Sequence, residues 1–145
     1  MTQNIYFDQI KEQNIDIRIP AKGMLSGRKY RDMSGHTVIV MADDYEDENI
    51  IRELADTILG RGCKNIAFCG STSDQWQDIF SEEDRQLNGF NDITGYEDFA
   101  VMWRFEDPEY LAAEVEGCWN EVLIICSNNA LVKECRNILS ESAWI

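Results

Sequence analysis

Short β-branched apolar runs alternate with amphipathic segments along most of the chain, and this alternation limits the possible folds more than any other feature. Residues 36–42 (HTVIVMA) form such a run, which predicts a buried strand. From residue 47 to residue 59 apolar side chains recur at helical spacing, and Gly60 and Gly62 predict the end of that helix. The first clear unit is therefore a strand followed by an amphipathic helix.

This unit occurs three more times. The further predicted strands are residues 64–69, 99–105 and 121–126. Each is followed by a helix-start signal: hydroxyl residues after Gly70, Asp107 directly before Pro108, and Asn128 or Asn129. The side chains expected on the buried faces of these helices include Trp76, Phe80, Leu87, Tyr110, Leu111 and Leu131.

Strands that are separated by helices cannot pair as hairpins, so the four are expected to be parallel and joined by right-handed crossovers. Helices then cover both faces of the sheet, which agrees with strands that are apolar throughout. The sequence predicts an α/β fold, a Rossmann-like or flavodoxin-like three-layer sandwich with a mostly parallel sheet of four to five strands. At 145 residues the chain has the length of a single domain, residues 1–145.

The first 35 residues have a different pattern. Residues 6–13 are compatible with a short helix, and residues 15–19 alternate with period two and stop at Pro20, as an edge strand does. Residues 21–35 combine glycine and serine with four basic side chains, which predicts an exposed basic loop. One arrangement places the N-terminal strand at an edge and orders the other four across the sheet as residues 64–69, 36–42, 99–105 and 121–126.

Acidic residues dominate the middle of the chain. The formal net charge is −14, and residues 41–121 contain 21 Asp or Glu against five Lys or Arg. Such a field repels nucleic acid and anionic membranes and favours a basic protein partner. We therefore expect a protein-binding role with no nucleic acid and no membrane as partner, and the sequence leaves the oligomeric state open.

Several missing patterns narrow the function further. No apolar run approaches the roughly 20 residues that cross a bilayer, and the N-terminus has no signal-peptide pattern, so a cytoplasmic location is expected. The five cysteines contain no C-x-x-C pair, which predicts reduced and mostly buried thiols.

Catalytic patterns are also missing. The single histidine, His36, is expected to lie half-exposed at a strand end. There is no nucleophile elbow and no glycine-rich nucleotide motif, and residues 69–73 (CGSTS) are only a weak signal for a phosphate cradle. We therefore expect no enzyme activity and no cofactor.

The carboxyl ends of the strands, where ligands bind in open parallel sheets, carry carboxylates and hydroxyls. Residues 38–62, beginning VIVMADDY, resemble the opening of response-regulator receiver domains. That resemblance implies Mg²⁺ binding at Asp43 and Asp44, with Asp107 as a third carboxylate and phosphoacceptor. It also places Ser127 where receivers carry a hydroxyl. A proline follows Asp107 and no fifth strand supplies the lysine of that family, so the alternative function is a degenerate receiver-like or nucleotide- or Mg-binding regulatory module.

Strand-end carboxylates equally serve as helix caps, and an acidic surface with aromatic side chains suits recognition of a cationic protein. The aromatic residues among the acidic ones are Tyr45, Trp76, Phe80, Tyr96 and Tyr110. In size, charge and expected location the chain resembles the small acidic immunity proteins of contact-dependent growth inhibition and related toxin systems. The resemblance implies an inhibitor that covers the active site of a basic, nuclease-type toxin. The residues expected to bind that partner are Asp43, Asp44, Glu46, Asp47, Asp78, Glu82, Glu83 and Asp84.

Overall fold

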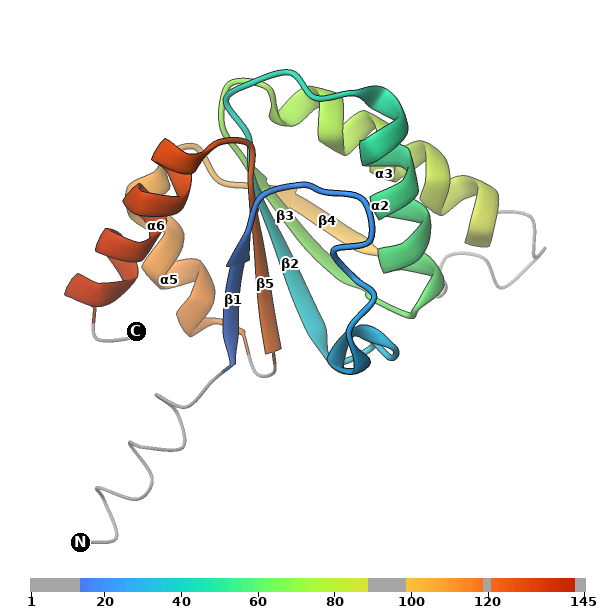
Figure 1. The fold of residues 1–145 in the computed structure, drawn as a ribbon, viewed down its shortest axis with the longest axis horizontal. Helices are drawn as coiled ribbons and strands as arrows, with labels where there is room; N and C mark the ends of the chain where they lie inside the picture. The colour runs from blue at the N-terminus through green and yellow to red at the C-terminus, as the bar shows by residue number, and fades with distance from the viewer. Residues whose placement is uncertain (1–13, 89–98, 119–120, 143–145) are drawn as a thin grey trace, which may run out of the picture.

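Five parallel strands form one sheet in the computed structural model, which describes residues 14–88, 99–118 and 121–142 (Figure 1). The strands are Ile15–Arg18 (β1), His36–Met41 (β2), Asn65–Cys69 (β3), Val101–Arg104 (β4) and Glu121–Cys126 (β5). Every neighbouring pair is parallel. The predicted Rossmann-like or flavodoxin-like α/β fold is confirmed, with an all-parallel sheet of five strands.

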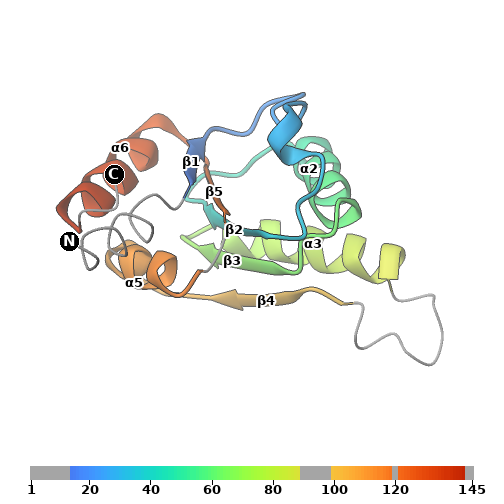
Figure 2. The ribbon, with the colours of Figure 1, turned by 90° about the horizontal axis from the view of Figure 1, so that it is seen from below.

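Helices cover both faces of this sheet (Figure 2). On one face lie Glu48–Gly60 (α2) and Ser73–Asn88 (α3), and on the other lie Leu111–Glu116 (α5) and Asn129–Glu141 (α6). Two short 3₁₀ turns, Arg28–Tyr30 (η1) and Pro108–Tyr110 (η3), precede β2 and α5. The described chain is therefore the three-layer sandwich that the sequence predicts.

The middle strand, β2, is buried along its whole length. Val38 and Val40 pack with residues of α2 and α3, while Ile39 and Met41 pack with residues of α5 and α6. Successive side chains of a strand point to opposite faces, so a strand that is covered on both sides must be apolar throughout. This requirement explains the unbroken apolar run in residues 38–42.

The strand order is β1-β5-β2-β3-β4, so the order expected for the four helix-linked strands is wrong. β3 and β4 follow β2 outward in one direction, because the crossovers through α2 and α3 lie on the same face. The crossover through α5 lies on the opposite face and returns the chain to β5 on the other side of β2. β1 lies at a sheet edge, as predicted, and pairs with β5.

The segment between β1 and β2, residues 19–35, crosses the α2 face of the sheet, and we call it the strap (Figure 1). Its basic side chains are exposed as predicted, but four apolar side chains are buried in the core: Met24, Leu25, Tyr30 and Met33. Arg61, just after α2, donates through Nη1 to the carbonyl oxygens of Leu25 (2.5 Å) and Tyr30 (2.9 Å). The predicted exposed basic loop is therefore correct for the basic side chains and wrong for these apolar ones. The sequence did not reveal their burial, because they follow no helix or strand period.

Two side chains that we expected in helix cores lie at the surface: Tyr110 is 60% exposed and Leu87 is 44% exposed. Tyr110 belongs to η3 and not to the helix that follows, so helical spacing does not apply to it. Leu87 lies beyond the last buried residue of α3. The predicted helix at residues 6–13 and the predicted loop at residues 90–98 fall outside the described residues. Among the described helices, none is long and apolar enough to cross a membrane.

Candidate functional site

The carboxyl ends of β2 and β5 meet at the point where the chain reverses its direction across the sheet. From β2 the chain moves outward to β3 and β4, then returns to β5 on the other side of β2. In open α/β sheets this switch point is where ligands bind. Asp43 and Asp44 follow β2, and Ser127 and Asn128 follow β5, so the structure brings these residues together.

Direct hydrogen bonds join the two loops at the switch point. The Ser127 Oγ accepts from the backbone N–H groups of Asp43 (3.0 Å) and Asp44 (3.4 Å). Asn128 donates through Nδ2 to the Asp44 carboxylate (2.6 Å), while its Oδ1 accepts from the backbone N–H of Leu131 (2.8 Å) and caps α6. These side chains therefore order the loop after β2.

The loop after β3 packs against the same residues through Gly70. Its φ is +115°, and a Cβ at this position would lie 2.1 Å from the carbonyl oxygen of Ala42. The close approach lets the backbone N–H of Ser71 donate to the Asp43 carboxylate (3.0 Å) and that of Thr72 donate to the Ala42 carbonyl (3.0 Å). The segment that offered a weak signal for a phosphate cradle thus binds the neighbouring loop.

Gln75 is a residue of this site that the sequence analysis did not single out. It lies in the first turn of α3, accepts from the backbone N–H of Glu46 through Oε1 (3.0 Å) and donates through Nε2 to the Glu46 carbonyl (2.7 Å). The side chain thereby engages both backbone groups of one residue and fixes the loop after β2. No local pattern marks Gln75, because the contact joins residues 29 positions apart.

The three carboxylates that the receiver-like alternative would use for Mg²⁺, Asp43, Asp44 and Asp107, do not form a metal-binding group. Within the described ranges, no cluster of three or more His, Cys, Asp or Glu side chains is arranged to hold a metal ion. Asp107 accepts a hydrogen bond from the backbone N–H of Glu109 (2.9 Å) and caps η3. These carboxylates instead cap a 3₁₀ turn and order the neighbouring loops, the second role that the sequence allows for carboxylates at strand ends.

Two tyrosines and several carboxylates are exposed at this end of the sheet, and we call residues 43–47 and 106–110 the acidic edge. Tyr45 is 81% exposed and Tyr110 is 60% exposed. The carboxylates are exposed as well, except for the half-buried Glu46. In the part of the chain that the structure describes, no Lys or Arg forms an ion pair with them. The acidic edge is thus an unneutralised negative surface with two aromatic side chains.

The expected partner-binding residues on α3 divide into two kinds. Asp78 and Glu82 are exposed, whereas Glu83 and Asp84 are only 4% and 5% exposed. Glu83 accepts from Nη1 of Arg52 on α2 (2.7 Å). Asp84 accepts from the backbone N–H of the residue before β4 (3.0 Å). Both therefore connect elements of the fold and are not available at its surface.

A second carboxyl group, that of Asp56 on α2, contacts Glu83. The hydrogen bond between them, aided by burial, raises the pKa of Asp56 to about 6. The same hydrogen bond lowers the pKa of Glu83, against the opposing effect of burial. Arg52 stabilises the ionised form of Glu83. At a pH between these two pKa values the carboxyl groups share one proton, so this contact between α2 and α3 depends on pH.

His36 is buried and not half-exposed as expected, with 4% of its surface accessible. Its Nε2 lies 2.9 Å from Oε2 of Glu121, and its ring centroid lies 5.6 Å from that of Tyr30. The Nδ1 is buried and has no hydrogen-bond partner among the described residues. β2 begins at His36, at the opposite end of the sheet from the acidic edge, so this histidine supplies no general base there.

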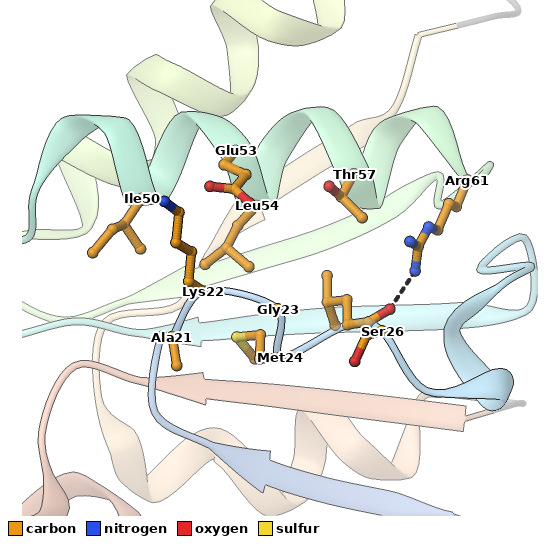
Figure 3. A pocket seen from close by; sticks show the side chains of 11 residues that line it. Ala21, Lys22, Gly23, Met24, Ser26, Ile50, Glu53, Leu54, Thr57 and Arg61 are labelled. Carbon is orange, nitrogen blue, oxygen red and sulfur yellow. Dashed lines mark hydrogen bonds between the residues drawn. The ribbon is translucent and has the colours of Figure 1, made fainter.

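Two of the cavities that described residues line lie outside the acidic edge. The smaller, about 140 Å³, lies between the strap and α2, with Lys22 and Arg61 toward its two ends and Glu53 on its helix side (Figure 3). A cavity of about this volume can hold a molecule the size of benzene. The larger, about 340 Å³, lies at the amino ends of β2 and β3 and is lined by Trp103, whose Nε1 donates to Oε2 of Glu114 (2.9 Å). Residues of the acidic edge line neither cavity.

Comparison with known proteins adds no relative: no family model matches the chain, no curated protein matches it, and no solved structure matches it. The fold and the site together define a Rossmann-like α/β domain that presents an acidic, tyrosine-bearing surface at its switch point.

Proposed function

We propose that the chain is a binding protein whose acidic edge docks onto a cationic protein. The observation that carries this proposal is Tyr45, which is 81% exposed in a loop whose carboxylates form no ion pair with a described Lys or Arg. An exposed tyrosine gains apolar burial and a hydrogen bond when a partner covers it. The surrounding carboxylates complement a basic surface and steer it toward the edge.

The loop that presents Tyr45 is held in place before any partner binds. Ser127 and Gln75 hydrogen-bond to its backbone, and Asn128 hydrogen-bonds to the Asp44 carboxylate. A partner that docks on a fixed loop does not have to order it, which lowers the entropic cost of association. The site thus combines an aromatic anchor, charge and preorganisation.

The partner class that fits best is a nuclease-type toxin, with this chain as the immunity protein that covers its active site. An enzyme that cleaves nucleic acid presents a cationic cleft to the phosphate backbone, and a chain with a net charge of −14 is attracted to such a cleft. Inhibition by steric cover requires neither a reacting group nor a cofactor from the chain.

The receiver-like alternative depends on Asp43, Asp44 and Asp107 around one ion. These three side chains do not form such a group. The alternative therefore lacks the structural support that the exposed acidic edge gives to protein binding.

Binding to a purified basic protein, first recovered with the tagged chain from its host, tests the proposal. Tyr45→Ala is expected to weaken the complex about tenfold or more, because truncation of a buried tyrosine anchor costs about 1.5–3 kcal/mol. Reversing two exposed charges with Glu106→Lys and Glu109→Lys is expected to slow association. High salt is expected to reduce the difference in association rate between this variant and the wild type. Calorimetry, stopped-flow rates and the partner's nucleic-acid cleavage are the measurements.

Glu141→Lys is the matched control, because Glu141 is exposed at the far end of α6 and outside the acidic edge. Circular dichroism checks that each variant is folded. If Tyr45→Ala and the double reversal bind a verified partner as tightly as the wild type does, the acidic edge is not the interface. A bound partner that cleaves no nucleic acid would contradict the immunity assignment alone.

A further inference from the structure

Two cysteine thiols lie in contact between β5 and α6. The Sγ atoms of Cys126, the last residue of β5, and Cys135, on α6, are 3.8 Å apart, and both residues are free cysteines with no exposed surface. We propose that Cys126 and Cys135 are a redox-active pair that closes to an intramolecular disulfide by exchange with a low-molecular-weight disulfide. The proposal is independent of the partner-binding function.

The short distance between the two sulfur atoms favours this pair, and the sheet register keeps Cys69 away from Cys126. A disulfide bond is about 2.05 Å long, so the two sulfur atoms must approach by less than about 2 Å. β5 and α6 are consecutive elements, and side-chain rotation with a small shift of the helix supplies that movement. Cys69 lies on β3, and Met41 of β2 pairs with both Cys69 and Cys126. Two strand spacings of about 4.8 Å therefore separate Cys69 from Cys126.

Access to the pair requires a local opening of α6. Three buried residues, Leu131, Cys135 and Leu139, hold α6 against the sheet, whereas α2 has five. The hydrogen bond to Cys135, together with burial, raises the pKa of the Cys126 thiol. Thiolate is scarce while the helix is closed, so reaction with an oxidant proceeds through the open form and is slow at neutral pH.

The exchange has two balanced steps. The thiolate of Cys135, exposed when α6 opens, attacks one sulfur of the small disulfide, forms a mixed disulfide and releases one small thiolate. The thiolate of Cys126 then attacks the Cys135 sulfur, forms the internal disulfide and releases the second small thiolate. Two protein thiols are oxidised, one small disulfide is reduced to two thiols, and the two protons pass to the released thiolates or to water.

The disulfide would restrain the loop that supports the acidic edge. Ser127 and Asn128 directly follow Cys126, and they hydrogen-bond to Asp43 and Asp44. Closure of the loop of residues 126–135 ties the middle of α6 to the end of β5. We expect the oxidised protein to melt about 5 °C higher than the reduced protein, because the cross-link restricts the unfolded chain.

Oxidised glutathione, added to the folded full-length chain, tests the pair. The expected product has lost two hydrogen atoms, and non-reducing tryptic digestion links residues 105–133 to residues 134–136. Fragment spectra distinguish Cys126 from Cys118, which is in the same peptide. Dithiothreitol is expected to reverse both the link and the rise in Tm.

Cys135→Ala is expected to abolish the link and the rise in Tm, and Cys69→Ala, a substitution of another buried thiol, is expected to leave both unchanged. The mapping on the wild-type chain decides the question even if a variant does not fold. If Cys126 and Cys135 stay unlinked in the folded chain under conditions that link them in the urea-unfolded chain, the proposal is overturned. A disulfide from either of them to Cys69 or Cys118 instead would also overturn it.

Discussion

Gly70 has a backbone conformation that side-chain-bearing residues rarely adopt, and its surroundings leave no room for a side chain. With φ at +115°, a Cβ would lie 2.1 Å from the Ala42 oxygen and 2.9 Å from Oδ1 of Asp43. Both atoms belong to the chain that leaves β2. The absence of a Cβ at Gly70 therefore sets how closely two loops of the switch point approach each other.

Gly70→Ala is expected to destabilise the protein by about 2–4 kcal/mol, since the new Cβ both strains the backbone and separates the loops. Urea unfolding measures the change. Gly60→Ala is the control, because that glycine ends α2 and nothing lies within 4 Å of its Cβ position. There the same substitution should change stability by less than about 1 kcal/mol. Equal losses at the two positions would contradict the close approach at Gly70.

Burial of single residues was predictable where it depends on local pattern and not where it depends on a distant partner. Trp76 and Phe80 are in the core as their helical spacing predicts. Glu83 was expected at the surface because it is charged, yet Arg52, 31 positions away, makes its burial possible. The burial of His36 also depends on a distant residue, because its Nε2 contacts a carboxylate oxygen of Glu121 on β5.

At the scale of elements, α2 and α3 meet through carboxyl groups as well as through apolar side chains. Asp56 has a pKa near 6 in the folded protein, above its ordinary value of 3.8, because of its hydrogen bond with Glu83. The folded state therefore binds this proton more tightly than the unfolded state does. The resulting stabilisation is complete below pH 3.8 and is lost as the pH rises through about 6.

Asp56→Asn is expected to stabilise the protein at pH 8 and to change it little at pH 4, because asparagine stays neutral and keeps a donor toward Glu83. Solvent screens the exposed Asp56, so the gain at pH 8 is about 1 kcal/mol or less, a rise in Tm of about 3 °C. Thermal melts at both pH values measure it. Glu53→Gln, at another exposed carboxylate of the same helix, controls for the loss of one negative charge. If the rise in Tm at pH 8 is no larger for Asp56→Asn than for the control, the interaction between Asp56 and Glu83 does not raise the pKa of Asp56.

Elements whose signals are local were predictable from the sequence. The starts of helices followed from caps such as Asp107, whose carboxylate accepts from the backbone N–H of Glu109 (2.9 Å), and Asn128. The strap was not predictable in the same way, because its position depends on Arg61 and on a sheet face that α2 and α3 leave uncovered. The acidic edge was only partly predictable, because the sequence shows its charges but not the exposure of Tyr45.

For the whole molecule, negative charge is concentrated enough for repulsion to oppose folding. The chain carries a net charge of −14, and few ion pairs offset it in the described part of the protein. Compaction brings the carboxylates closer together than they are in the unfolded chain.

Raising NaCl from about 20 mM to about 200 mM is therefore expected to increase Tm by a few degrees, because the Debye length falls to about 7–8 Å. Scanning calorimetry measures the rise. Choline chloride at equal ionic strength should have the same effect if screening is responsible. A fall in Tm with salt would mean that attractive ion pairs outweigh the repulsion.

The parallel three-layer architecture was predictable because four strand-helix units are visible in the sequence, whereas the strand order was not. Order depends on which face each crossover takes, and no short pattern records that choice. The face of α5, opposite to that of α2 and α3, is what brings β5 to the centre beside β2.

The adjacency of β1 and β5 has a consequence for how the molecule is made. The register Ile15↔Val122 joins strands that more than a hundred residues of chain separate, and β2 also depends on β5 for one of its two neighbours. On the ribosome, β1 and one side of β2 must wait without their partner until residues 121–126 have emerged. The sheet can then close only after residues 121–126 have been made, so until that point the growing chain exposes unpaired strand edges, which favour aggregation.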